Sequence, residues 1–142
     1  MIKFYRVKDD YGWMSNFAKY SIQIDMKMWP TVEHYFQAQK FPDNPEYQEL
    51  IRKQKSAMTS AQMGRDRNYP LRADWEEVKD SIMLKALRAK INQHPELLLA
   101  LKETGDEELV EHTSNDNYWG DGGDGSGKNM LGKLLMQIRA DI

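Results

Sequence analysis

A glycine-rich segment at residues 111–129 constrains the fold of this chain more than any other part of the sequence. It holds five glycines, three aspartates and two aromatic residues between a short apolar run and a predicted helix, Met130 to Ile138. Glycine lets the backbone take positive φ and approach a ligand closely, while asparagine and aspartate stabilise turns. We therefore expect an ordered loop into which the following helix directs its N-terminal amides. That arrangement suits an anion such as a phosphate.

Two well-known ligand-binding loops do not fit this segment. Gly122, Gly127 and Lys128 have the spacing of a phosphate-binding loop, but Asn129 stands where the pattern has Ser or Thr. No apolar strand runs into Gly122, and neighbouring aspartates would repel a triphosphate. A calcium-binding EF-hand needs glutamate at its twelfth position, and none of the three aspartates has one there.

Composition limits the classes of protein that the chain can represent. Its 142 residues and 16.7 kDa fit one domain over 1–142 with a useful core. A formal charge of -2 gives no global basic field, so tight sequence-independent binding of nucleic acid is not expected. The absence of cysteine excludes disulfides and thiolate metal sites. Without a signal-like N-terminus or a long apolar run, we expect a cytoplasmic protein that does not enter a membrane.

The periodicity of apolar residues predicts a helix-dominated α+β domain with a small sheet. Short alternating stretches at 2–4 and 22–26 indicate strands. Thr31 can cap a helix that runs to about Lys40, Pro45 opens another, and a short one ends near Gly64. The strongest helical pattern starts at Asp74, and a leucine-rich helix runs from Pro95 to Gly105.

Polar residues at helical spacing give the first candidate site. Glu33, Gln37 and Lys40 fall on one face of the helix that Thr31 begins. Such a stripe is commonly solvated and supported by i,i+4 pairs. Because it opens directly after Trp29 in a segment dense with aromatic residues, a pocket wall is the competing interpretation.

Other residues fit both a functional and a structural role. Arg65 and Arg67 beside a glycine can clamp a phosphate, although surface arginines are commonly just solvated. Trp75 in the first turn of its helix is by default a core anchor, whereas Trp119 on a glycine-rich loop suits stacking on a ligand. The histidines lack metal-binding spacing, and no nucleophile elbow is present. The remaining carboxylates, lysine and aromatics suit cleavage of a glycosidic bond without a metal or other cofactor.

Four motifs in order along the chain resemble the YbiA-like, or NADAR, family. They are Trp13-x-Ser15-Asn16-Phe17, Trp29-Pro30-Thr31-x-Glu33 through Phe41, Met63-Gly64-Arg65-Asp66-Arg67, and Glu111-His112-Thr113 through Tyr118-Trp119-Gly120 to Asn129-x-Leu131-Gly132. The resemblance implies an N-glycosidase that splits the bond between ribose and a nitrogenous base. It also implies the substrate classes, which are ribosylaminopyrimidine 5'-phosphates of riboflavin synthesis and ADP-ribose derivatives, including ADP-ribosylated guanine in DNA.

By this resemblance the catalytic residues are Glu33, Trp75 and Asp116. We expect the two carboxylates to act at C1 of the ribose, one by proton transfer to the departing base and the other by stabilising the oxocarbenium-like centre or activating water. Lys40 either completes a salt-bridged stripe or holds the phosphate, or else it attacks C1 and forms an imine. The residues expected to bind the substrate are Asn16, Phe17, Arg65, Arg67, Trp119, Gly120, Gly122, Gly125, Lys128 and Asn129.

Two other classes of function compete with the N-glycosidase. A binding module would hold ADP-ribose or NAD with the same loop and aromatics and show no turnover. A purely structural protein would leave the polar stripe and the loop unexplained. The expected partner is a phosphorylated N-riboside, and nucleic acid only if ADP-ribosylated DNA is the substrate.

Overall fold

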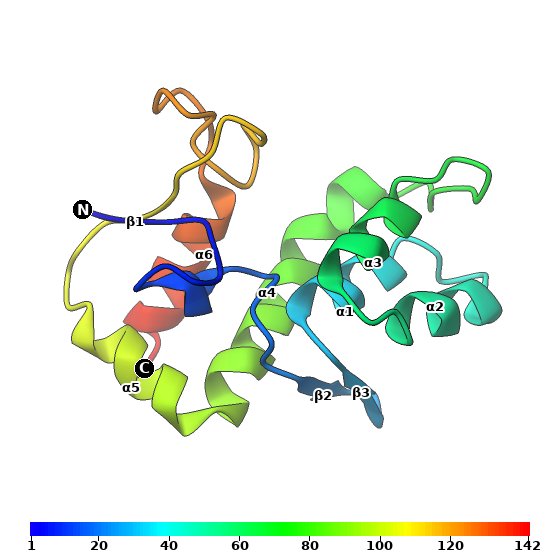
Figure 1. Ribbon diagram of the computed structural model, residues 1–142, viewed down its shortest axis with the longest axis horizontal. Helices are drawn as coiled ribbons and strands as arrows, with labels where there is room; N and C mark the ends of the chain where they lie inside the picture. Colours follow the sequence, from blue (N-terminus) through cyan, green and yellow to red (C-terminus); the bar gives the residue numbers. More distant parts are fainter. The chain divides into compact units, whose positions relative to one another are not determined.

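The structure is a computed structural model that describes residues 1–142, and its contacts divide the chain into two units (Figure 1). The central unit comprises Lys19–Gln93, and the terminal unit joins Met1–Ala18 to His94–Ile142. Glu33, Lys40 and Trp75 therefore belong to the central unit. The glycine-rich segment with Asp116 belongs to the terminal unit.

The central unit opens with a β-hairpin. Strands β2 (Ile22–Ile24) and β3 (Lys27–Trp29) pair antiparallel, with Ile22 opposite Trp29. Asp25 and Met26 form the two-residue turn with φ of 55° and 66°, so the chain reverses where the sequence pattern predicted a strand continuing to Met26. That prediction is wrong because a turn with two positive φ values normally carries glycine or asparagine, and neither is present.

Four helices follow, and the first lies inside the unit. Helix α1 (Val32–Ala38) is capped by the Thr31 hydroxyl, which accepts from the amide of His34 as predicted. All seven of its residues are buried, since it packs against the other three helices (Figure 1). Those helices are α2 (Pro45–Arg52), α3 (Ala57–Gly64) and α4 (Trp75–Gln93). Polar side chains on α1 are therefore held among neighbouring helices rather than in bulk water.

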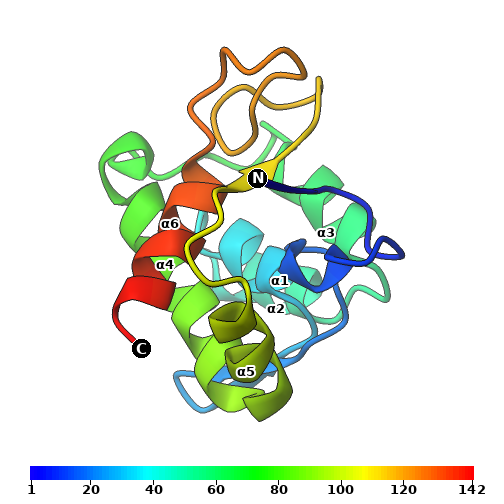
Figure 2. The ribbon, with the colours of Figure 1, turned by 90° about the vertical axis from the view of Figure 1, so that its left-hand side faces the viewer.

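The terminal unit combines a parallel strand pair with two helices. Strand β1 (Ile2–Phe4) pairs with β4 (Leu109–Glu111), and Ile2 lies opposite Leu109. Helix α5 (Pro95–Glu103) precedes β4, and α6 (Met130–Ala140) packs on β4 after the glycine-rich loop (Figure 2). A short 3-10 helix, η1 (Gly12–Met14), follows β1.

Close packing of α6 on β4 depends on one glycine. A Cβ atom at Gly132 would lie 2.0 Å from the carbonyl oxygen of Leu109, so no larger residue fits there. The helix-dominated α+β fold class is confirmed, with the strands forming two separate two-stranded sheets. None of the helices is both long and apolar enough to span a membrane.

Candidate active site

The polar face of α1 is buried, so the solvated-stripe interpretation is wrong. Glu33, Gln37 and Lys40 are only 8%, 4% and 9% exposed. The side-chain amide of Gln37 donates to Oε2 of Glu33 at 2.7 Å. This bond joins two successive turns of the helix and fixes the direction of the carboxylate.

Lys40 lies over the aromatic ring of Trp75. Its Nζ is 5.6 Å from the ring centroid, within the range of a cation–π contact. Burial and the charge of Arg67 lower the pKa of Lys40 to about 8, and the opposing effect of Glu33 does not cancel them. The amine is therefore partly uncharged near neutral pH, which a nucleophile or a proton acceptor requires.

Three further cations lie close enough to Lys40 to act on it through their charges. Arg65, Arg67 and Lys79 all lower the pKa of Lys40, and we call Lys40 and these three side chains the basic cluster. Arg67 is oriented by a hydrogen bond of 2.9 Å from its Nη2 to the Gly64 carbonyl. Such a cluster suits a phosphate, and both arginines are exposed enough to reach one.

Lys79 was not among the residues predicted from the sequence. A sequence signal for it exists, since Lys79 stands one helical turn after Trp75 on α4 and so shares its face. Its side chain is 12% exposed and pairs with Glu76 at 2.7 Å.

Arg72 ties the end of α1 to the start of α4. Its backbone amide donates to the Lys40 carbonyl at 3.0 Å, and its Nη1 donates to the Gln39 carbonyl at 3.3 Å. The same guanidinium binds both carboxylate oxygens of Asp74, at 2.6 and 3.1 Å. Trp75 follows directly, and its ring lies 5.0 Å from that of Phe36. The position of Trp75 under Lys40 is thus set by bonds on both sides.

In the terminal unit, Asp116 is held at one end of the glycine-rich loop. Its Oδ1 accepts from the amides of Tyr118 and Trp119 at 2.9 and 2.8 Å. Both bonds go to Oδ1, which leaves Oδ2 available to a ligand. The Tyr118 and Trp119 rings meet edge to face at 4.9 Å, and Lys128 Nζ lies 5.4 Å from the Tyr118 centroid.

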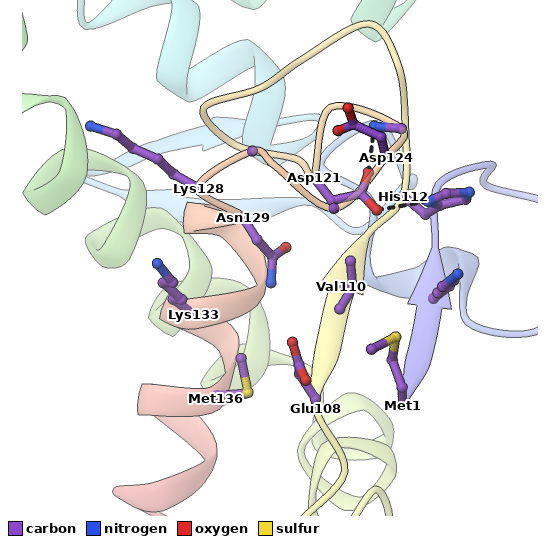
Figure 3. A pocket seen from close by; sticks show the side chains of 14 residues that line it. Met1, Glu108, Val110, His112, Asp121, Asp124, Lys128, Asn129, Lys133 and Met136 are labelled. Atoms are coloured by element: carbon purple, nitrogen blue, oxygen red, sulfur yellow. Dashed lines mark hydrogen bonds and ion pairs between the residues drawn. The ribbon is translucent and has the colours of Figure 1, made fainter.

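Asp121 organises the middle of the loop. Its Oδ1 accepts from the amides of Thr113 and Gly123, and its Oδ2 bonds His112 Nδ1 at 2.7 Å (Figure 3). Burial alone would raise the pKa of Asp121, but the His112 bond and the two amides outweigh it and bring the pKa to about 2. Gly122 and Gly125 take φ of 74° and 88°, as the sequence predicted for this loop.

The N-terminus of α6 is not an open anion site, contrary to the sequence-based prediction. The amides of Asn129, Met130 and Leu131 donate to the carbonyls of Gly120, Tyr118 and Trp119 at 2.9, 3.0 and 3.1 Å. The loop folds back over the helix and uses the donors that a phosphate would need.

Two of the predicted binding residues have structural contacts in this unit. The Asn129 side chain accepts from the Glu111 amide and donates to the Leu109 carbonyl, so both ends of its amide hold β4. Gly120 is buried, and a Cβ there would lie 2.8 Å from Thr113 Cγ2. These contacts account for the residue types at 120 and 129 without a ligand.

A cavity of about 460 Å³ opens beside the loop in the terminal unit (Figure 3). Lys133 and Met136 of α6 line one side, and Val110 of β4 faces them. Its charged side chains comprise three lysines and three acidic residues apart from His112, so these side chains give it no excess of positive charge. The basic cluster of the central unit is the more suitable phosphate site.

Asn16 and Phe17 follow η1 in the terminal unit. Asn16 is buried, and the Phe17 amide donates to the Ser15 hydroxyl at 3.1 Å, which turns the chain there. The cavity beside the loop does not include either residue.

A buried carboxylate–amide pair, a basic cluster over an aromatic ring and an aspartate on a glycine-rich loop characterise this α+β protein. The sequence model described as the NADAR domain matches residues 3–142, and the chain belongs to the NADAR family.

Named relatives share the full length of the chain. It is 58% identical to N-glycosidase YbiA of Escherichia coli (strain K12), over 100% of this chain and 88% of that protein. It is 40% identical to the chloroplastic riboflavin biosynthesis protein PYRR of Zea mays, covering 25% of that longer protein. The NMR structure of Escherichia coli YbiA matches with a TM-score of 0.91 at 58% identity, over 99% of this chain and 83% of that one.

Proposed function

We infer that this chain is an N-glycosidase that hydrolyses the bond between ribose and base in phosphorylated ribosylaminopyrimidines of riboflavin biosynthesis. Water supplies the hydroxyl that replaces the base at C1 and the proton that the base carries away, so the products are the free base and ribose 5-phosphate. The names of the relatives support this reaction class, and the NADAR domain that carries it spans both units.

The observation that carries the proposal is the buried carboxylate of Glu33, which interacts through its charge with Lys40, the member of the basic cluster that lies over the Trp75 ring. Cleavage of an N-glycosidic bond builds positive charge on the sugar ring, and a fixed carboxylate stabilises that charge. The substrate also brings a phosphate dianion, for which the cations provide partners.

We assign the chemistry to Glu33, Asp116 and Lys40, with Trp75 forming the aromatic wall. Asp116 supplies the second carboxylate, and its two amide bonds keep it fixed without occupying Oδ2. Trp119, Asn16 and Phe17 are proposed contacts for the base and ribose. Gly122, Gly125 and Lys128 shape the loop around Asp116.

The 5'-phosphate is placed on Arg65, Arg67 and Lys79. This differs from a pose on α6, whose first amides are already bonded to loop carbonyls. Arg67 is the sharpest probe, since its side chain is exposed and a hydrogen bond to the Gly64 carbonyl orients its guanidinium.

The test is turnover of a substrate panel by the purified protein. Ribosylaminopyrimidine 5'-phosphate, its dephosphorylated form, NAD, ADP-ribose and ADP-ribosylated DNA are each incubated, and released base is followed by chromatography. We expect turnover of the first compound and a loss of both kcat and affinity when the phosphate is removed.

Arg67→Gln tests the contact between the protein and the 5'-phosphate. It should raise KM about tenfold or more for the phosphorylated substrate and change little for the dephosphorylated one, because the lost contact is to the phosphate. Preferential release of base from ADP-ribosylated DNA would replace the proposed substrate by ADP-ribose derivatives, and tight binding with no turnover of any compound would indicate a binding module.

A further inference from the structure

A side-chain hydrogen bond from Gln37 joins Glu33 to the next turn of α1. Its Nε2 lies 2.7 Å from Glu33 Oε2, and both side chains are buried. A hydrogen bond that is shielded from water and ends on a carboxylate is stronger than an exposed neutral one. Gln37 therefore has direct influence on the charge state and direction of the Glu33 carboxylate.

The orientation of the Gln37 amide indicates which charge state it favours. Its Oε1 exposes less than 1 Å² and has no hydrogen-bond partner. An ionised carboxylate is only an acceptor, so it requires the NH₂ side of the amide to face it. A protonated Glu33 could instead donate to Oε1 if the amide turned over. In the observed orientation the NH₂ group of Gln37 donates to the Glu33 carboxylate, and the buried Oε1 of Gln37 has no partner.

Gly64 makes room for that orientation. A Cβ at Gly64 would lie 1.8 Å from Oε1 and 2.6 Å from Cδ of Gln37. The φ of Gly64 is not among the positive values, so space rather than backbone conformation requires glycine at this position. The Gly64 carbonyl also orients Arg67. One residue at the end of α3 thus serves both the carboxylate and the basic cluster.

The charged groups around Glu33 and Gln37 also favour the ionised form of Glu33. Arg65 and Arg67 after α3 and Lys79 of α4 each act through their charge on Lys40, which follows α1, and Glu33 acts on Lys40 with the opposite sign. Cations near a carboxylate favour its ionised form. Gln37 adds to this field a directional contact that fixes where the negative oxygen lies.

We propose that Gln37, accommodated by Gly64, is a positioning residue that keeps Glu33 as an ionised carboxylate aimed at the reacting ribose. The proposal rests on the N-glycosidase function proposed above. It assigns different roles to the two carboxylates, because a carboxylate held in its ionised form cannot begin the reaction as the proton donor. Glu33 then stabilises the oxocarbenium-like centre or accepts a proton from the nucleophile, and protonation of the departing base falls to another group.

Gln37→Met tests the contact, since it keeps the length of the side chain and removes both polar atoms. We expect kcat to fall about tenfold or more with KM nearly unchanged. The acid limb of the pH–rate profile should move to higher pH, because an ionised Glu33 without its donor is protonated more easily. Gln39→Met removes the same amide from the end of the same helix and should leave both quantities unchanged. An acid limb that does not move in Gln37→Met would overturn the proposal.

Gly64→Ala tests the accommodation independently. The new Cβ should displace the Gln37 amide and reproduce the kinetic defect of Gln37→Met. In a Gln37→Ala background, where the space is empty, Gly64→Ala should cost nothing further. Equal costs of Gly64→Ala in both backgrounds would show that Gly64 does not act through Gln37.

A measurement without substrate separates this proposal from the proposed function. In wild-type protein, the NMR signals of the Gln37 side-chain NH₂ should shift with pH as Glu33 is protonated, and Glu33→Gln should abolish that titration. If the titration is present but no compound is hydrolysed, the positioning role stands and the function fails. If the Gln37 signals do not respond to pH or to Glu33→Gln, the positioning role fails, whatever the activity.

Discussion

The carboxylates of Glu33 and Asp116 are held by quite different means, although both are proposed to act on the ribose. Glu33 is buried on a helix and is bonded by a side chain, whereas Asp116 is half-buried on a loop and is bonded by two backbone amides. Glutamine or asparagine keeps a carbonyl oxygen that can still accept these bonds, so isosteric substitution removes charge and proton transfer while the local structure is retained.

Glu33→Gln and Asp116→Asn should therefore each lower kcat by about a hundredfold or more, the order expected for losing acid–base assistance. Steady-state release of base measures the effect, and an unchanged thermal melting temperature shows that the fold survives. Asp124→Asn on the same loop is the control, because its carboxylate is exposed and bonds only Ser126. Substantial activity in the Glu33→Gln Asp116→Asn double variant would contradict the assignment.

Lys40 has the surroundings of a nucleophile rather than of a surface cation. With a pKa lowered to about 8, roughly a tenth of its amines are uncharged at pH 7. Attack of that amine on C1 expels the base, and opening of the ribose ring gives an iminium that water releases. We expect borohydride added during turnover to trap a protein–ribose adduct, which peptide mass spectrometry locates at Lys40.

The pH dependence of trapping gives a second check. The yield should rise between about pH 7 and 9 as Lys40 loses its proton, because its pKa is about 8. Lys40→Arg keeps the charge but cannot form an imine, so it should give no adduct and little turnover. If Lys40→Arg retains most activity, water attacks directly and Lys40 serves only the phosphate.

At the scale of elements, the glycine-rich loop acts as a folded unit closed by Asp121. Three donors converge on this one carboxylate, from Thr113, Gly123 and His112. Further backbone bonds tie the loop to the start of α6. The loop presents Asp116 reliably only while this arrangement is intact.

Asp121→Ala should open the loop, because two amide donors lose their shared acceptor. We expect limited proteolysis within 112–128 to accelerate about tenfold or more at pH 7, with kcat/KM falling in parallel. His112→Ala removes only one of the three donors and leaves the carboxylate in place, so its effect should be clearly smaller. Equal cleavage rates for wild type and Asp121→Ala would show that other contacts close the loop.

Elements that depend on local chemistry were predictable from sequence, and those that depend on packing were not. Thr31, Pro45 and Pro95 each begin a helix as predicted, because caps and N-terminal prolines act within one turn. Strand β3 was missed since its turn is made by Asp25 and Met26. In the same way, nothing near Gly64 in sequence indicates that Gln37 occupies the space of its missing side chain.

The residues of the candidate site also separate into those that local sequence predicts and those that packing determines. Glu33, Lys40 and the glycine-rich loop were selected from residue type and spacing, which are local properties, whereas Asp116 was selected within that loop by the family resemblance. Burial of the polar face of α1 could not be predicted, because it results from three helices packing around seven residues. The occupied amides of α6 were also unpredictable, since the carbonyls that bind them lie about ten residues earlier in a loop without regular structure.

For the whole molecule, pH dependence of stability should be governed by lysines rather than carboxylates near neutrality. Lys90 on α4 is 2% exposed, and burial lowers its pKa from 10.5 to about 7. Its Nζ lies 5.7 Å from the Tyr20 ring centroid. Between these two pH values the unfolded chain holds a proton that the folded protein has released. The free energy of unfolding must therefore rise with pH across that window, and Lys40 adds to the rise above about pH 8.

We expect urea unfolding at pH 7, 8 and 9.5 to give a steadily increasing free energy of unfolding, in contrast to the usual plateau near neutrality. The range stops below pH 10 because the pKa of Tyr35 is raised to about 12, so unfolded tyrosine loses its proton first and reverses the slope.

Lys90→Met should be more stable than wild type at pH 7 and should flatten most of the pH dependence, since it removes a buried amine that has to be neutralised. Lys85→Met on the same helix is the matched control, because the Lys85 side chain is 56% exposed and its removal should leave the slope unchanged. A wild-type free energy of unfolding that is flat from pH 7 to 9.5 would show that Lys90 keeps its proton in the folded protein, supported by the Tyr20 ring and by its other contacts within the fold.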